Sequence, residues 1–130
     1  PHSHRFDFQC LVLAGTVTNV IWSLAPDHLD DGDYFAGSVL RYGGSPGEYQ
    51  RYPGEVACYV STATAHEAGD WYGMRHNEIH SIFFSRGAKV LFFEGPQISN
   101  ETLILEPWVN GERVPTFEVK PWMFTTAAPF

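Results

Sequence analysis

Eight short runs of β-branched and aromatic residues follow one another along the chain, and Gly, Pro, Asn or Asp bounds each of them. These residue types favour strands, and the bounding residues favour turns. No window of useful length shows the 3.6-residue apolar period of an amphipathic helix. The sequence therefore predicts a nearly all-β chain, with strands over residues 9–14, 16–24, 34–42, 55–64, 79–84, 88–94, 102–109 and 113–119.

Two dipeptides predict tight hairpin turns. Ala14-Gly15 separates the first two predicted strands, and Asn110-Gly111 separates the last two. Asn-Gly accepts the positive φ angles that two-residue hairpin loops require. Many short strands with frequent turns are typical of a β-sandwich or barrel. Residues 25–53 are rich in Asp, Gly, Pro and Tyr, and this composition predicts a long surface excursion that is a candidate lid.

Length and charge limit the classes of partner. The 130 residues suit one domain, so we expect residues 1–130 to form a single domain, complete or as the core of a longer chain. No apolar run approaches the ~20 residues that a membrane helix needs. Eight Lys and Arg against fifteen Asp and Glu give a formal charge of −7, which repels phosphate backbones. We therefore expect neither a membrane nor a nucleic acid as partner.

The two cysteines bear on the compartment. Cys10 and Cys58 both lie in apolar stretches, where a buried free thiol is commoner than a disulfide. Free thiols predict a reducing compartment, and hence a cytoplasmic protein. Cys10 also has the same parity along the chain as His2 and His4, and we expect it to be a small buried side chain that faces the same interior.

Two histidines, His2 and His4, stand one residue apart directly ahead of a long apolar run. Side chains alternate faces along a strand, so both imidazoles point the same way and are able to chelate one ion. A third ligand would come from a distant strand. His80 opens a predicted apolar strand and is the expected third ligand, with His66 or His76 as alternatives.

Gly69 precedes His80 by eleven residues, and residues 68–72 read Ala-Gly-Asp-Trp-Tyr. This spacing, together with His-Ser-His before an apolar strand and a glycine, resembles the cupins. Their first motif carries His-x-His, and their second carries a lone histidine. The resemblance implies a jelly-roll β-barrel of two antiparallel sheets, inside which His2, His4 and His80 converge as metal ligands.

Phe8 stands where many cupins have a glutamate ligand. The remaining three-histidine set is similar to that of the thiol dioxygenase branch, which includes cysteine dioxygenase. That resemblance implies Fe(II); imidazole also suits Zn, Ni and Cu, and Mn is a further candidate divalent ion. The expected function is a mononuclear non-haem iron dioxygenase acting on a small-molecule substrate. The alternatives are a non-redox metal-binding cupin, such as an isomerase, a lyase or a small-ligand-binding protein, and a metal-free β-barrel with incidental histidines.

Other side chains are candidates for contacts with substrate or dioxygen. An arginine fork suits a small acidic substrate, and a tyrosine hydroxyl is able to bond to substrate or dioxygen. Tyr59, Tyr72 and Arg75 are the residues expected in these roles. The sequence also leaves a homodimer open, because the apolar residues 121–124 are suited to covering a strand edge or a neighbouring subunit.

Overall fold

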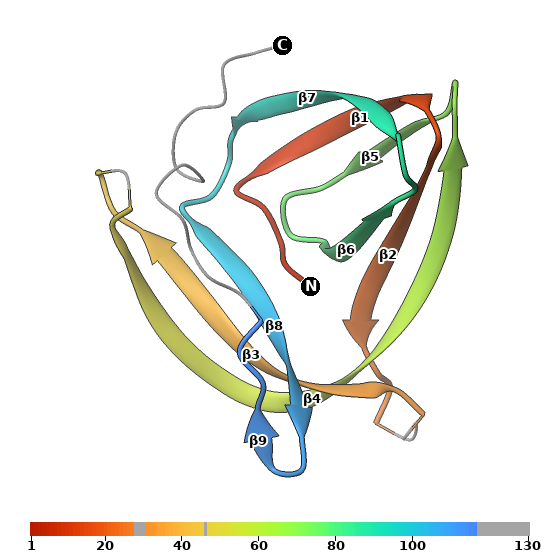
Figure 1. Ribbon diagram of the computed structural model, residues 1–130. Helices are drawn as coiled ribbons and strands as arrows, with labels where there is room; N and C mark the ends of the chain where they lie inside the picture. Colours follow the sequence, from red (N-terminus) through yellow and green to blue (C-terminus); the bar gives the residue numbers. More distant parts are fainter. Residues whose placement is uncertain (28–30, 46, 117–130) are drawn as a thin grey trace.

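A computed structural model of the chain describes residues 1–27, 31–45 and 47–116 (Figure 1). The regular structure of these residues is entirely β: nine strands form two antiparallel sheets, and no helix is present among them. The prediction of an all-β chain is therefore confirmed. Over the same residues no helix is long and apolar enough to cross a membrane. The predicted C-terminal apolar cover, residues 121–124, lies outside the described residues.

The smaller sheet has three strands in the order β5-β1-β7, and the larger sheet has six in the order β6-β2-β4-β3-β8-β9. The smaller sheet consists of β1 (Phe6–Ala14), β5 (Trp71–Met74) and β7 (Lys89–Gln97). The larger consists of β2 (Thr16–Leu24), β3 (Asp33–Tyr42), β4 (Tyr49–Glu67), β6 (Ile79–Phe84), β8 (Glu101–Val109) and β9 (Glu112–Arg113).

Residues 25–53 do not form a long excursion, so that prediction is wrong. They contain β3 and the start of β4, and both belong to the larger sheet. Phe35 and Leu40 on β3 are buried, and their burial outweighs the turn-forming composition around them.

The four-residue β5 was not predicted, and β4 extends well beyond the predicted 55–64. In the last predicted strand, 113–119, only Arg113 is in a strand, and residues 117–119 lie outside the described range.

The two predicted hairpins differ in outcome. Asn110-Gly111 joins β8 to β9 with φ angles of 52° and 78°, as a two-residue hairpin loop requires. Ala14-Gly15 is not a hairpin, because β1 and β2 belong to different sheets. Gly15, with φ of 73°, instead turns the chain from one sheet to the other. Each strand pairs elsewhere: β1 with β5 and β7, and β2 with β4 and β6.

A hydrophobic cluster fills the space between the two sheets. On β1 alternate residues Phe8, Cys10 and Val12 are buried, as the period of two along a strand dictates. They pack with Val17 of β2 and with residues of β5. Val12 and Val17 are fully buried, and each contributes roughly 1.5–3 kcal/mol.

Residues 1–3 lie between β6 and β8 (Figure 1). In the strand order of the larger sheet these two strands are separated by β2, β4 and β3. On one side His2 N donates to His80 O at 3.0 Å, and His80 N donates to His2 O at 2.9 Å. On the other side Ser3 N donates to Leu103 O at 2.8 Å, and Leu105 N donates to the backbone oxygen of Pro1 at 2.9 Å. This short segment therefore joins two distant strands of the larger sheet and carries two of the candidate ligands.

Candidate metal centre

His2, His4 and His80 lie together, as the sequence predicted. One ligand atom of each lies within 4.8 Å of the others, and their ring centroids are 4.8 to 5.1 Å apart. His4 Nε2 and His80 Nε2 are 2.9 Å apart. Among the residues that the structure describes, this is the one group of three or more His, Cys, Asp or Glu side chains with metal-binding geometry.

The backbone explains why these three rings meet. His2 and His4 share one face of the N-terminal segment, and Ser3 points the other way, where its hydroxyl accepts from Leu103 N at 2.8 Å. His2 pairs directly with His80 across an antiparallel bridge, so their side chains stand on the same face. His4 N in addition donates to His76 O at 3.0 Å, which anchors the segment against the loop before β6.

Apolar rings line the histidine group. The Phe8 ring lies 5.0 Å from that of His4 and 5.8 Å from that of His80, and Phe6 lies 5.5 Å from His4. Phe8 therefore provides a hydrophobic wall beside His4 and His80. Such a wall lowers the local dielectric and excludes water.

Burial controls the charge of the three imidazoles. Desolvation, followed by the repulsion of neighbouring positive charge, lowers the pKa of His2 to about 4, of His4 to about 3 and of His80 to about 4. All three are consequently neutral at pH 7. Because a metal ion binds the unprotonated nitrogen of a neutral imidazole, no proton has to be displaced from a charged ring.

Asn19, which the sequence reasoning missed, fixes the tautomer of His80. Asn19 Oδ1 lies 2.7 Å from His80 Nδ1, and Asn19 Nδ2 donates to Met74 Sδ at 3.3 Å. With the amide in this orientation, Oδ1 is only able to accept, so Nδ1 of His80 carries the proton. The lone pair of Nε2 then points toward His4. A single polar residue on the buried face of the apolar strand β2 was the signal that could have identified Asn19.

The donor set fits a transition metal. Two imidazole nitrogens bound at a right angle to one ion, each at about 2.1 Å, are about 3 Å apart, and the 2.9 Å between His4 and His80 is close to that separation. Three neutral nitrogen donors suit Fe, Zn, Cu and Ni better than Ca or Mg, which prefer oxygen. The three residues are thus able to hold such an ion, and the donor set leaves its identity open.

The other predicted site residues lie in different surroundings. Tyr72 on β5 is buried, its ring lies 6.4 Å from Phe8, and its hydroxyl has no hydrogen-bond partner among the described residues. Burial, reinforced by the neighbouring Cys10, raises the pKa of Tyr72. Tyr59 packs against Phe35, at 5.8 Å, in a second cluster within the larger sheet. Arg75 is exposed in the turn before β6, where its backbone N donates to the Glu78 carboxylate.

The alternative histidines lie outside the group. His66 stacks on Tyr72 with 4.5 Å between ring centroids. His76 is held by Asp7, whose carboxylate accepts from its backbone N at 2.7 Å. Cys10 is buried as expected, and burial raises the pKa of its thiol; Cys10 and Cys58 are both free thiols.

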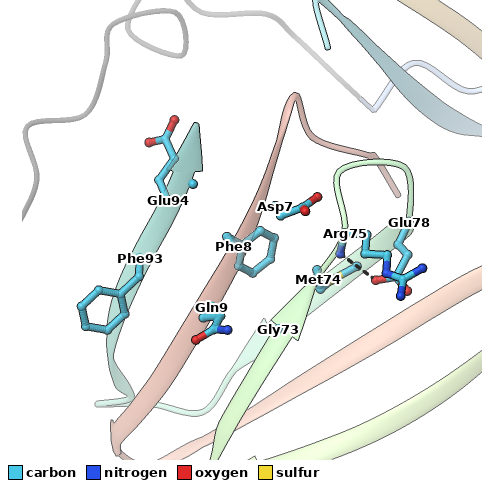
Figure 2. A pocket seen from close by; sticks show the side chains of 10 residues that line it. Asp7, Phe8, Gln9, Gly73, Met74, Arg75, Glu78, Phe93 and Glu94 are labelled. Carbon is cyan, nitrogen blue, oxygen red and sulfur yellow. Dashed lines mark hydrogen bonds between the residues drawn. The ribbon is translucent and has the colours of Figure 1, made fainter. Parts of the chain in front are cut away.

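One hollow has none of the three histidines in its wall, although Phe8 contributes to its lining. An open pocket of about 590 Å³ lies across β1, β5 and β7 (Figure 2), and charged side chains of Asp7, Arg75, Glu78 and Glu94 surround it. None of the three histidines lines it. A smaller hollow of about 220 Å³ has His4, a candidate ligand, in its wall, and it is therefore the candidate approach to the metal centre.

Comparisons of the chain with models of protein families, with curated proteins and with solved structures found no match. The function is therefore inferred from the geometry of the site and from the residues that form it.

Proposed function

We propose that this protein is a cupin-type metalloenzyme, specifically a mononuclear non-haem iron dioxygenase of the cysteine dioxygenase-like type that acts on a small molecule. The observation that carries the proposal is the convergence of three neutral imidazoles beside an apolar residue, Phe8. The hydrogen bonds of residues 1–3 to both β6 and β8 support the architectural part, a jelly-roll barrel closed around the site.

His2, His4 and His80 would hold an iron(II) ion, which when bound would supply the electron transfer that a reaction of dioxygen with an organic molecule needs. The residues of the chain prepare that site. Asn19 keeps the proton of His80 on Nδ1. Phe6 and Phe8 keep water away and keep the imidazoles neutral. The buried hydroxyl of Tyr72, which neighbours Cys10, is the proposed donor to a bound substrate.

Metal content and oxygen uptake together test the proposal. Protein purified without added metal is analysed for iron, zinc, nickel, manganese and copper, and oxygen consumption is followed with small thiols such as cysteine. We expect about one iron per chain and uptake that depends on it. Zinc or nickel without oxygen uptake would instead assign the protein to the non-redox metal-binding cupins.

A pair of variants tests the ligand set itself. His80→Ala removes a ligand that is 3% exposed, whereas His66→Ala removes a ring outside the group and serves as the matched control. We expect His80→Ala to lose the bound metal and His66→Ala to retain it. Unchanged metal content in a folded His80→Ala protein would eliminate the three-histidine centre.

A further inference from the structure

One face of the smaller sheet points away from the larger sheet. On β1 the residues Phe8, Cys10 and Val12 are buried on the inner face, so Gln9 and Leu11 between them stand on the outer face. Residues directly opposite each other on neighbouring strands share a face. Two rows therefore cross the outer face from β5 to β7: Trp71, Leu11 and Leu91 in one, and Gly73, Gln9 and Phe93 in the other.

Two exposed aromatic rings meet across β1 on this outer face. Trp71 on β5 and Phe93 on β7 are stacked, with ring centroids 5.7 Å apart and an angle of 28° between the ring planes. The two residues nevertheless remain 56% and 51% exposed. Large apolar side chains that gather on a surface commonly mark a binding site. The pair forms an aromatic platform beside the hollow that spans β1, β5 and β7.

The second row of residues lines that hollow. Gly73, Gln9 and Phe93 all contribute to its wall, and Figure 2 shows them on the three neighbouring strands. A Cβ added to Gly73 would lie 3.5 Å from Cγ of Gln9, so a larger side chain there would occupy the space beside the amide. The hollow has a volume of about 590 Å³. Small-molecule pockets commonly measure about 300–1,000 Å³.

Hydrogen-bond donors and acceptors both surround the hollow. The Gln9 amide offers donors and an acceptor, the Glu94 carboxylate accepts, and the Arg75 guanidinium donates. Neither the Gln9 amide nor the Glu94 carboxylate has a hydrogen-bond partner among the described residues. Asp7 is engaged, because its carboxylate accepts from the backbone N of His76 at 2.7 Å. A ligand in the hollow therefore meets at least two polar side chains that need a partner.

Charge narrows the class of ligand. The charged side chains that line the hollow are those of Asp7, Glu78, Glu94 and Arg75. Their excess of negative charge, on a chain with a formal charge of −7, opposes the binding of phosphates and carboxylates. An organic cation would be repelled by Arg75 and would leave the N–H groups of Gln9 without an acceptor. A neutral molecule with several hydroxyl groups matches both kinds of side chain, because each hydroxyl donates and accepts.

A sugar ring also matches the aromatic platform. One face of such a ring carries mainly C–H groups, which pack against the negative face of an aromatic side chain. We propose that this hollow binds a neutral carbohydrate, with one sugar ring resting on Phe93 and its hydroxyl groups bonded to Gln9 and Glu94. None of the three histidines lines the hollow, so this binding site and the metal centre are tested separately.

NMR titrations of the isotope-labelled full chain provide the test. The neutral probes are glucose, galactose, mannose, N-acetylglucosamine, maltose and cellobiose. We expect at least one of them to shift the indole N–H of Trp71 and the backbone N–H groups of Gln9 and Gly73, with a Kd on the order of 1 mM. Glucuronate, which is glucose with a carboxylate, and tetramethylammonium, a cation without hydroxyl groups, should each bind about tenfold more weakly than the best neutral sugar.

Variants with a matched control locate the site. Phe93→Ala removes the platform and should weaken binding about tenfold, and Gln9→Ala should weaken it about three- to tenfold. Phe84→Ala removes a phenylalanine on β6 that is 55% exposed and does not line the hollow, so it should bind like the unmodified protein. The proposal is overturned if no neutral sugar shifts these signals at about 50 mM. Tighter binding of tetramethylammonium than of every sugar, or equal affinity in Phe93→Ala and Phe84→Ala, would also overturn it.

Discussion

Asn19 shows how one buried amide determines the chemistry of the candidate centre. Its 2.7 Å contact with His80 decides which ring nitrogen carries the proton, and the contact with Met74 holds the amide in place. A metal-binding histidine commonly donates its other N–H to a fixed acceptor, and that acceptor raises the basicity of the ligand. Asn19 is 5% exposed, so water cannot readily replace it in this role.

Replacing Asn19 with Ala should weaken metal binding about 10- to 100-fold, because His80 loses its orientation and its preferred tautomer. Asn19→Asp should bind more tightly than Asn19→Ala, since a carboxylate also accepts from Nδ1. Thr64→Ala is the matched control, because Thr64 is exposed directly opposite Asn19 on β4. Affinity for Co²⁺, measured in competition with a chelator, tests the prediction. Equal affinity in Asn19→Ala and Thr64→Ala would contradict it.

The sequence alone identified His2, His4 and His80, because their spacing along the chain indicates where their side chains lie. The proximity of His2 and His4 follows from strand alternation, and His80 was identified by its spacing from Gly69 in a resemblance to the cupins. Asn19 was missed because its role depends on a residue 61 positions away along the chain. The expected substrate roles of Tyr59, Tyr72 and Arg75 stay predictions, because their side chains were selected by type and not by position.

Among the elements, the turn at Gly15 shows why strand order was harder to predict than strand location. The dipeptide Ala14-Gly15 indicates a chain reversal, and a reversal between two strands usually means a hairpin. Here the turn leads from one sheet to the other, and Ser85 holds it by accepting from Thr16 N at 2.9 Å. Which strands pair depends on contacts among all nine strands, and no short stretch of the sequence indicates those contacts.

Gly15→Ala should destabilise the protein by about 3 kcal/mol, because an alanine meets two penalties there. The φ angle of 73° is costly for any residue with a Cβ, and that Cβ would lie 2.7 Å from Ser85 Oγ and 2.9 Å from Ala88 Cα. Gly87 has a similar φ of 77° with no atom within 4 Å, so Gly87→Ala should cost only about 1 kcal/mol. Urea denaturation measures both; equal costs would show that the crowding at Gly15 is unimportant.

At the scale of the whole molecule, the three buried histidines make stability depend on pH. Their folded-state pKa values of about 3 to 4 lie below the value of 6.5 expected in the unfolded chain. Between about pH 6.5 and 4 the unfolded chain consequently binds more protons than the folded one. The stability of the metal-free protein should therefore fall as the pH falls through this range.

We expect chelator-treated protein to lose several kcal/mol of stability between pH 7 and pH 4, since a one-unit difference in pKa between folded and unfolded states is worth about 1.4 kcal/mol. Chemical denaturation at a series of pH values measures the loss. His2→Asn should give a shallower dependence because it removes one of the buried titrating groups. A stability that is constant from pH 7 to pH 5 would contradict the burial of these rings.

The fold class was predictable because β-branched residues, turn residues and alternation are local signals that recur throughout the chain. The division into sheets of three and six strands was not, because it depends on contacts between distant segments such as His2 with His80 and with Ile104. The length of β4 was also missed, since its exposed Ser, Thr and Ala residues lack the apolar alternation that identifies a half-buried strand.

The position of residues 1–3 between β6 and β8 has a consequence for synthesis on the ribosome. His4 and His80 are 76 residues apart in the chain, and at about 5–20 residues per second the later one is made roughly 4 to 15 s after the earlier. Until then the segment with His2 and His4 has neither of its strand partners. During that interval the nascent chain presents two of the three ligands without the third, and a complete centre begins only once β6 and β8 have emerged.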